Sequence, residues 1–85
     1  MPYYVYIIQS QTDESYCIGT SRDLTERIER HNQGRSKYTK PKRPWNLVYI
    51  EEHPDRSSAM KREYAIKRRK SKDYLAKLIE KFSSG

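Results

Sequence analysis

A carboxylate occupies a position where a helix would be expected to bury an apolar side chain. In the segment SSAMKREYAIKRRK, Glu63 falls on the same helical face as Ala59, Met60 and Ile66, because an α-helix advances about 100° per residue. Burying an unpaired charge is costly. We therefore expect Glu63 to pair with a cation, bind a metal or line a cleft that admits water.

A second predicted helix carries two more ionisable residues on its apolar stripe. In DLTERIERHN, Arg27 and His31 share the stripe formed by Leu24 and Ile28, so they too are predicted to point inward. Each has a simpler structural explanation. Arg27 could pack its stem while its head reaches water or form an ion pair with Glu63, and His31 could interact with the last carbonyls of its helix.

Composition limits the class of protein. The 85 residues suit one domain, and a formal charge of +7 with a pI near 9.6 favours a polyanionic partner. The single cysteine, Cys17, cannot close an intramolecular disulfide, and no zinc-binding spacing is present. No apolar run suits a membrane span or a signal peptide. We expect a reduced, cytoplasmic protein that does not engage a membrane.

Two basic segments could contact phosphates. The first is the loop RSKYTKPKR, and the candidate nucleic-acid-binding residues in it are Arg35, Lys37, Tyr38, Lys40, Lys42 and Arg43. The alternative for this loop is a solvated connection with turn residues at Gly34, Pro41 and Pro44. The second segment, KRRKSK at 67–72, suits phosphate contacts or the junction of two helices, where Ser71 would be the N-cap of the second.

The elements that must position these residues follow from hydrophobic periodicity. A strand at 3–9 has two apolar faces and is predicted to be central. Two further strands are expected at 16–19 and 47–52. Helices are expected at 24–32, after Asp55, and from Ser71 onward. The last of these helices carries an apolar stripe formed by Leu75, Leu78, Ile79 and Phe82. The order β-β-α-β-α-α predicts a single α+β domain over residues 1–85, with a three-stranded antiparallel sheet flanked by helices.

These segments together resemble a known family. The strand YVYII, the second strand ending in Cys17, Ile18 and Gly19, and the segments DLTERIERHN, SKYTKPKRPWNLVY and AMKREYAIKR are similar to the GIY-YIG nuclease domain. The resemblance spans roughly residues 3–80 and is strongest to small single-domain bacterial members, the UPF0213-like proteins. It implies a relation to the catalytic domain of the bacterial excision repair nuclease.

The resemblance implies specific roles. Glu63 would hold a single divalent metal, Mg²⁺ or Mn²⁺, and Arg27 would neutralise charge on the scissile phosphate. Tyr6 would help to activate the attacking water, and His31 could share the proton. The general base stays open, because a phenol has an ordinary pKa near 10. Tyr6 could serve only if nearby cations depress that pKa or if the metal acidifies the water.

One position departs from the family pattern. Cys17 stands where the second motif carries a tyrosine, and Tyr16 should point to the opposite face of the strand. Two functions of different class follow from this. The first is a metal-dependent endonuclease, a hydrolase acting on branched, damaged or single-stranded DNA in repair or processing, with RNA left open as a substrate. The second is a catalytically weakened or inactive nucleic-acid-binding module of the same fold. A monomer is expected.

Overall fold

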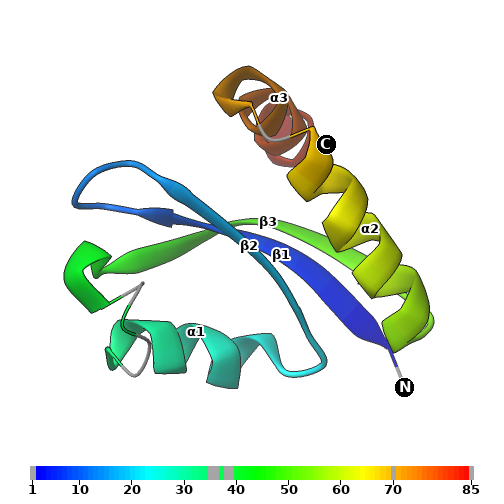
Figure 1. The fold of residues 1–85 in the computed structure, drawn as a ribbon, viewed down its shortest axis with the longest axis horizontal. Coiled ribbons are helices and arrows are strands. Elements are labelled where there is room, and N and C mark those ends of the chain that lie inside the picture. Colours follow the sequence, from blue (N-terminus) through cyan, green and yellow to red (C-terminus); the bar gives the residue numbers. More distant parts are fainter. Residues whose placement is uncertain (1, 35–36, 38–39, 70, 85) are drawn as a thin grey trace.

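A computed structural model describes residues 2–34, 37, 40–69 and 71–84 of the chain (Figure 1). Its elements are β1 (Tyr3–Ser10), β2 (Tyr16–Ser21), α1 (Leu24–Asn32), the short 3₁₀ helix η1 (Lys40–Lys42), β3 (Trp45–His53), α2 (Arg56–Arg68) and α3 (Lys72–Ser84). Apart from η1, this order confirms the predicted one. None of the helices in the described ranges is both long and apolar enough to cross a membrane.

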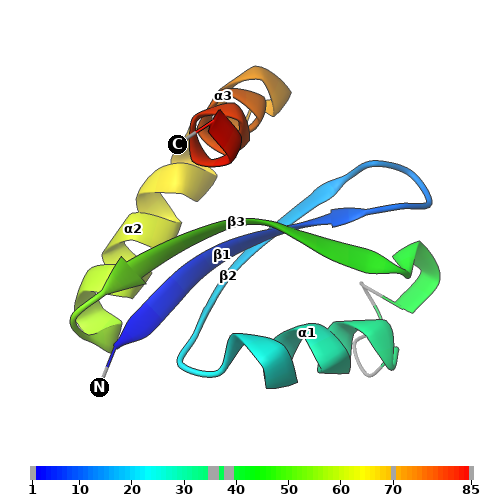
Figure 2. The ribbon, with the colours of Figure 1, turned by 180° about the vertical axis from the view of Figure 1, so that it is seen from behind.

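The sheet is antiparallel with strand order β2-β1-β3, so β1 is the central strand as predicted. Helix α1 lies against one face, while α2 and α3 lie on the other (Figures 1 and 2). In the register of β1 and β2, Tyr6 is paired with Gly19 and Ile8 with Cys17. The register of β1 against β3 shifts between Ile7 and Ile8.

Alternation along β1 supplies a core on each face of the sheet. Val5 and Ile7 belong to one buried cluster, which includes Ala59, Ile66 and Leu75 from the two C-terminal helices. Tyr6 and Ile8 join Trp45 in a second cluster, against which Leu24 and Ile28 of α1 pack. The two apolar faces expected for this strand are therefore confirmed, and the second core is the one that holds α1 in place.

Local capping explains where the helices begin. The side chain of Asp23 accepts a hydrogen bond from the Glu26 amide, and that of Asp55 accepts one from the Ser58 amide. The Ser71 hydroxyl accepts a hydrogen bond of 3.0 Å from the amide of Tyr74. The basic segment 67–72 thus spans the junction between α2 and α3. The strands are longer than predicted, since β2 continues to Ser21 and β3 begins at Trp45.

Three residues that the sequence predicted on inward-facing stripes of helices are exposed instead. Met60 is 47% exposed, and Arg27 is also exposed. In α2 the buried side chains are Ala59 and Ile66, and because one residue turns the helix by about 100°, Met60 faces away from the sheet. Phe82 is 48% exposed at the C-terminal end of the stripe on α3, although its ring centroid lies 5.5 Å from that of Tyr49.

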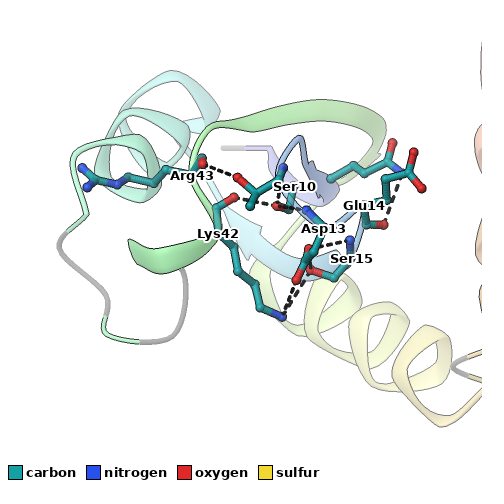
Figure 3. A network of polar contacts seen from close by, with 8 residues as sticks. Ser10, Asp13, Glu14, Ser15, Lys42 and Arg43 are labelled. Atoms are coloured by element: carbon teal, nitrogen blue, oxygen red, sulfur yellow. Dashed lines mark hydrogen bonds and ion pairs between the residues drawn. The ribbon is translucent and has the colours of Figure 1, made fainter.

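A polar network fastens the β1–β2 hairpin to the segment that precedes β3 (Figure 3). The buried Ser10 hydroxyl donates a hydrogen bond of 2.6 Å to the carbonyl of Lys42. The Lys42 ammonium lies 3.4 Å from Asp13 Oδ2 and donates to the Ser15 hydroxyl at 3.3 Å. Hydrogen bonds from Ser15 lower the pKa of Asp13 to about 2, so this carboxylate is charged at neutral pH.

Candidate active site

The centre of the candidate site is a contact between Tyr6 of β1 and His31 of α1. The Tyr6 hydroxyl lies 3.3 Å from His31 Nε2, and the Tyr6 side chain is almost fully buried. The imidazole lies near two aromatic rings, with its centroid 6.3 Å from that of Tyr6 and 6.3 Å from that of Trp45. The packing of α1 on the second core therefore brings together two residues that the sequence separates by 25 positions.

Gly19 of β2 makes room for the Tyr6 ring. A Cβ atom at this position would lie 2.5 Å from the Tyr6 hydroxyl oxygen and 2.7 Å from its Cζ. Because Tyr6 and Gly19 are cross-strand partners, the phenol must lie directly over the glycine. Sequence reasoning treated Gly19 as a motif residue at a strand end and missed this steric role. Only the strand register identifies it.

The protein environment sets the protonation states of the Tyr6–His31 pair. Burial raises the pKa of Tyr6 to about 12; Cys17 adds to the rise, Arg27 opposes it, and Glu63 adds to it. Burial lowers the pKa of His31, and the charge of Arg27 lowers it further. At neutral pH the phenol is therefore protonated and the imidazole neutral. One hypothesis from the sequence required nearby cations to depress the pKa of Tyr6. Arg27 acts in that direction, but burial has the larger effect and the pKa of Tyr6 is raised.

Arg27 of α1 and Glu63 of α2 influence the same phenol electrostatically. The charge of Arg27 lowers the pKa of Tyr6, and that of Glu63 raises it. The Glu63 side chain is 19% exposed and forms an ion pair of 2.6 Å with Lys67, whose side chain is 50% exposed. Among the described ion pairs there is none between Arg27 and Glu63, so the structural bridge considered for these residues is not formed.

Cys17 lies at the edge of the same site. It is half-buried and packs against the cluster of Tyr6, Ile8 and Trp45, whereas Tyr16 packs against the cluster on the opposite face. The register between β1 and β2 runs without a bulge from Tyr4 to Gln9. The expectation that Tyr16 cannot supply the missing phenol is confirmed.

The Glu63 carboxylate suits a divalent metal ion whose coordination shell is completed by the substrate. In the described part of the chain, no group of three or more His, Cys, Asp or Glu side chains could hold an ion. Mg²⁺ is commonly bound by one or two carboxylates together with substrate phosphates and water. Glu63 suits this mode, because it is a hard oxygen ligand that remains partly exposed and is paired with a displaceable lysine.

The structure describes four of the six basic-loop residues that were predicted to contact nucleic acid. Lys37 and Lys40 are exposed, and Arg35 and Tyr38 lie outside the described residues. Lys42 is engaged with the hairpin. Arg43 donates from Nε to the Lys40 carbonyl at 3.0 Å and from a terminal nitrogen to the Asn32 carbonyl at 3.5 Å. Lys42 and Arg43 thus help to hold the loop, and phosphate contacts by all six residues stay a prediction.

Sequence reasoning missed two residues that position the site. The Asn32 amide accepts a hydrogen bond of 2.7 Å from the Trp45 N–H and donates one of 3.3 Å to its carbonyl, which fixes the end of α1 beside β3 and with it the neighbouring His31. No sequence signal identifies this contact. Lys67 pairs with Glu63 at a spacing of four residues, and that spacing could have predicted it.

This protein is a small α+β domain in which a phenol of the central strand contacts an imidazole of α1. The family model described as "GIY-YIG catalytic domain" matches residues 2–77, and the chain belongs to this nuclease domain family.

Two relatives and one solved structure agree with this assignment. UPF0213 proteins of Staphylococcus aureus strains Mu3 and N315 are each 46% identical over 66 residues, which cover 76% of this chain and 79% of theirs. The solution NMR structure of the UPF0213 protein BH0048 from Bacillus halodurans matches with a TM-score of 0.59 and 33% identity, covering 94% of this chain and 84% of that one.

Proposed function

We propose that this protein is a divalent-metal-dependent endonuclease that hydrolyses DNA phosphodiester bonds during the repair or processing of branched, damaged or single-stranded DNA. The observation that carries the proposal is the contact of the Tyr6 hydroxyl with His31 Nε2 at 3.3 Å. The charges of Arg27 and Glu63 act on the same phenol. Membership of a nuclease domain family supports the reaction class.

Charge at the phosphate is the first requirement of this chemistry. Hydrolysis gathers negative charge on the non-bridging and leaving oxygens, and the Arg27 guanidinium can hold two of these oxygens with its planar fork. Glu63 would hold a Mg²⁺ or Mn²⁺ ion, which would supply further neutralisation of that charge when bound. The exposure of Arg27 leaves its head accessible to a phosphate arriving from solvent.

Proton transfer is the second requirement. In the tautomer that carries its ring proton on Nδ1, His31 accepts the Tyr6 hydroxyl proton at Nε2 across the 3.3 Å contact. The attacking water gives its proton to the Tyr6 oxygen as that oxygen gives its own to His31, so the phenol passes a proton on without becoming a phenolate. A neutral imidazole with a lowered pKa and a phenol with a raised pKa suit this order.

A cleavage assay tests the proposal. Purified protein is incubated with labelled duplex, flap and single-stranded DNA, and with single-stranded RNA, in Mg²⁺, Mn²⁺ or EDTA. We expect products from DNA only when a metal is present. Glu63→Ala should reduce the rate by about a hundredfold or more, with only a modest loss of binding. Glu52→Ala, which removes an exposed carboxylate from β3, is the matched control and should cleave like wild type.

Two results would contradict the proposal. Binding without products from any substrate under either metal would refute the nuclease and leave a nucleic-acid-binding module of the same fold. Cleavage that survives Glu63→Ala would mean that this residue does not hold the metal.

A further inference from the structure

The outward side of α2 carries an aromatic and basic surface that the proposed reaction does not use. Tyr64 is 65% exposed and Met60 is 47% exposed. Together with Arg56, Ser57 and Lys61 they line a shallow hollow on this helix. We define the α2 patch as Arg56, Met60, Lys61, Tyr64 and Arg68.

The α2 patch adjoins the carboxylate of the candidate site. Arg56, Met60, Tyr64 and Arg68 follow one another at intervals of four residues and so form one row along the helix. Glu63 precedes Tyr64 directly, and a step of one residue turns the helix by about 100°. The row that contains Tyr64 therefore lies on the side of α2 next to the side that carries Glu63. A strand whose phosphate would be bound there through the proposed metal ion can continue onto this row.

The charge and chemistry of the α2 patch match a nucleic acid. Arg56, Lys61 and Arg68 are exposed cations, and Glu63 is the one acidic residue in the sequence of α2. The Arg68 guanidinium carbon lies 5.7 Å from the centre of the Tyr64 ring. An exposed ring beside cations is the arrangement on which unpaired bases stack while their phosphates are neutralised. A paired duplex would hide its base faces from such a ring.

We propose that the α2 patch binds the unpaired DNA strand next to the scissile phosphate, with one base stacked on Tyr64 and its phosphates near Arg56, Lys61 and Arg68. This inference rests on the proposed nuclease function, because the α2 patch lies beside a scissile bond only if the protein cleaves DNA. It also assigns single-stranded segments as the substrate element that the enzyme engages.

Binding to a fluorescent oligothymidine in EDTA, followed by anisotropy, tests the stacking contact without cleavage. Tyr64→Leu should weaken binding roughly fivefold or more, whereas Tyr64→Phe, which keeps the ring, should stay within about twofold of wild type. A strand of abasic nucleotides keeps the phosphates but offers no base. Wild type and Tyr64→Leu should bind that strand equally, and a Tyr64→Leu protein that binds oligothymidine like wild type would overturn the proposal.

The basic part of the patch has its own test. Lys61→Met should reduce the slope of log affinity against log salt by about 0.7, the contribution of one phosphate contact to a single strand. Lys77→Met removes the same charge from the exposed surface of α3 and should leave the slope unchanged. Equal changes for both variants would show attraction by net charge alone and would overturn the assignment to α2.

Two further outcomes separate this inference from the nuclease proposal. Binding that depends on Tyr64 in a protein that cleaves nothing would keep the α2 patch and refute the nuclease. Cleavage by a protein whose DNA affinity does not depend on Tyr64 would keep the nuclease and refute the α2 patch. A change of oligomeric state in Tyr64→Leu, seen by light scattering with DNA affinity unchanged, would assign the patch to a second copy of the chain and refute our inference.

Discussion

The hydroxyl of Tyr6 lies 3.3 Å from Nε2 of His31, and this contact joins the central strand to α1. Both groups are shifted by burial toward their uncharged forms, which raises the pKa of Tyr6 and lowers that of His31. A protonated phenol and a neutral imidazole make an uncharged pair that can lie in a half-buried site and still exchange a proton. Changes to the residues that hold this pair, or to the carboxylate near it, should therefore alter cleavage.

Gly19→Ala should destabilise the protein by about 1–3 kcal/mol, the usual range for forcing extra volume into a packed site. The new Cβ would lie 2.5 Å from the Tyr6 hydroxyl oxygen, so the ring must move and its contact with His31 should be lost. Urea unfolding measures the change in free energy, and the cleavage rate should fall with it.

The control for Gly19→Ala is the same change in a Tyr6→Leu background. With the ring removed, the three atoms that would lie closest to the added methyl are absent, so the substitution should cost less free energy of unfolding than it does in wild type. A cost that is the same in both backgrounds would contradict the steric explanation.

His31 should titrate below its ordinary pKa of about 6.5, because burial and Arg27 both disfavour its charged form. The contribution of neutral His31 to the free energy of unfolding is fully present above the pKa that His31 has in the unfolded chain. It is lost as the pH falls through the lower pKa of His31 in the folded protein. NMR titration of the ring protons measures this pKa directly. Cleavage should decline over the same acidic range, and His31→Gln should abolish that part of the pH profile. A His31 pKa above that of a model peptide would refute the assignment.

Cys17→Tyr should raise the cleavage rate, because it restores the phenol that the family carries at this position. Cys17 faces the same cluster as Tyr6, so a tyrosine there would enter the site and not the opposite face. Cys17→Phe supplies the same ring without the hydroxyl and is the matched control. Initial rates at saturating metal compare the variants, and a lower rate for Cys17→Tyr than for wild type would show that the site is built around the thiol.

Lys67→Met should lower the concentration of Mg²⁺ needed for half-maximal cleavage. The lysine ammonium lies 2.6 Å from Glu63 Oε2 and competes with a cation for that oxygen. Half of the lysine side chain is exposed, and exposed pairs contribute about 0.2–1 kcal/mol, so the shift should be at most about fivefold. Isothermal titration with Mn²⁺ in the absence of DNA provides a readout besides activity. An unchanged or higher metal requirement would mean that Glu63 does not bind the ion.

Sequence alone determined the elements and their order, because each is specified locally. The two apolar faces of β1 required a central strand, the capping side chains of Asp23, Asp55 and Ser71 fixed the helix starts, and the order of elements was confirmed. The family, too, was recognisable from the order and spacing of its motifs. Strand ends were less accurate, since pairing with a neighbour extends a strand beyond its apolar run.

Only the tertiary structure decided which groups meet and in which charge state. Helical spacing placed Met60 inward, but the sheet contacts a narrower side of α2 and leaves that residue in solvent. The partner of Glu63 is Lys67, Gly19 is required by the ring of Tyr6, and Asn32 fixes α1 to Trp45. These facts depend on register and packing between segments far apart in the chain, and burial then sets the pKa of Tyr6 and His31, which no local pattern of residues encodes.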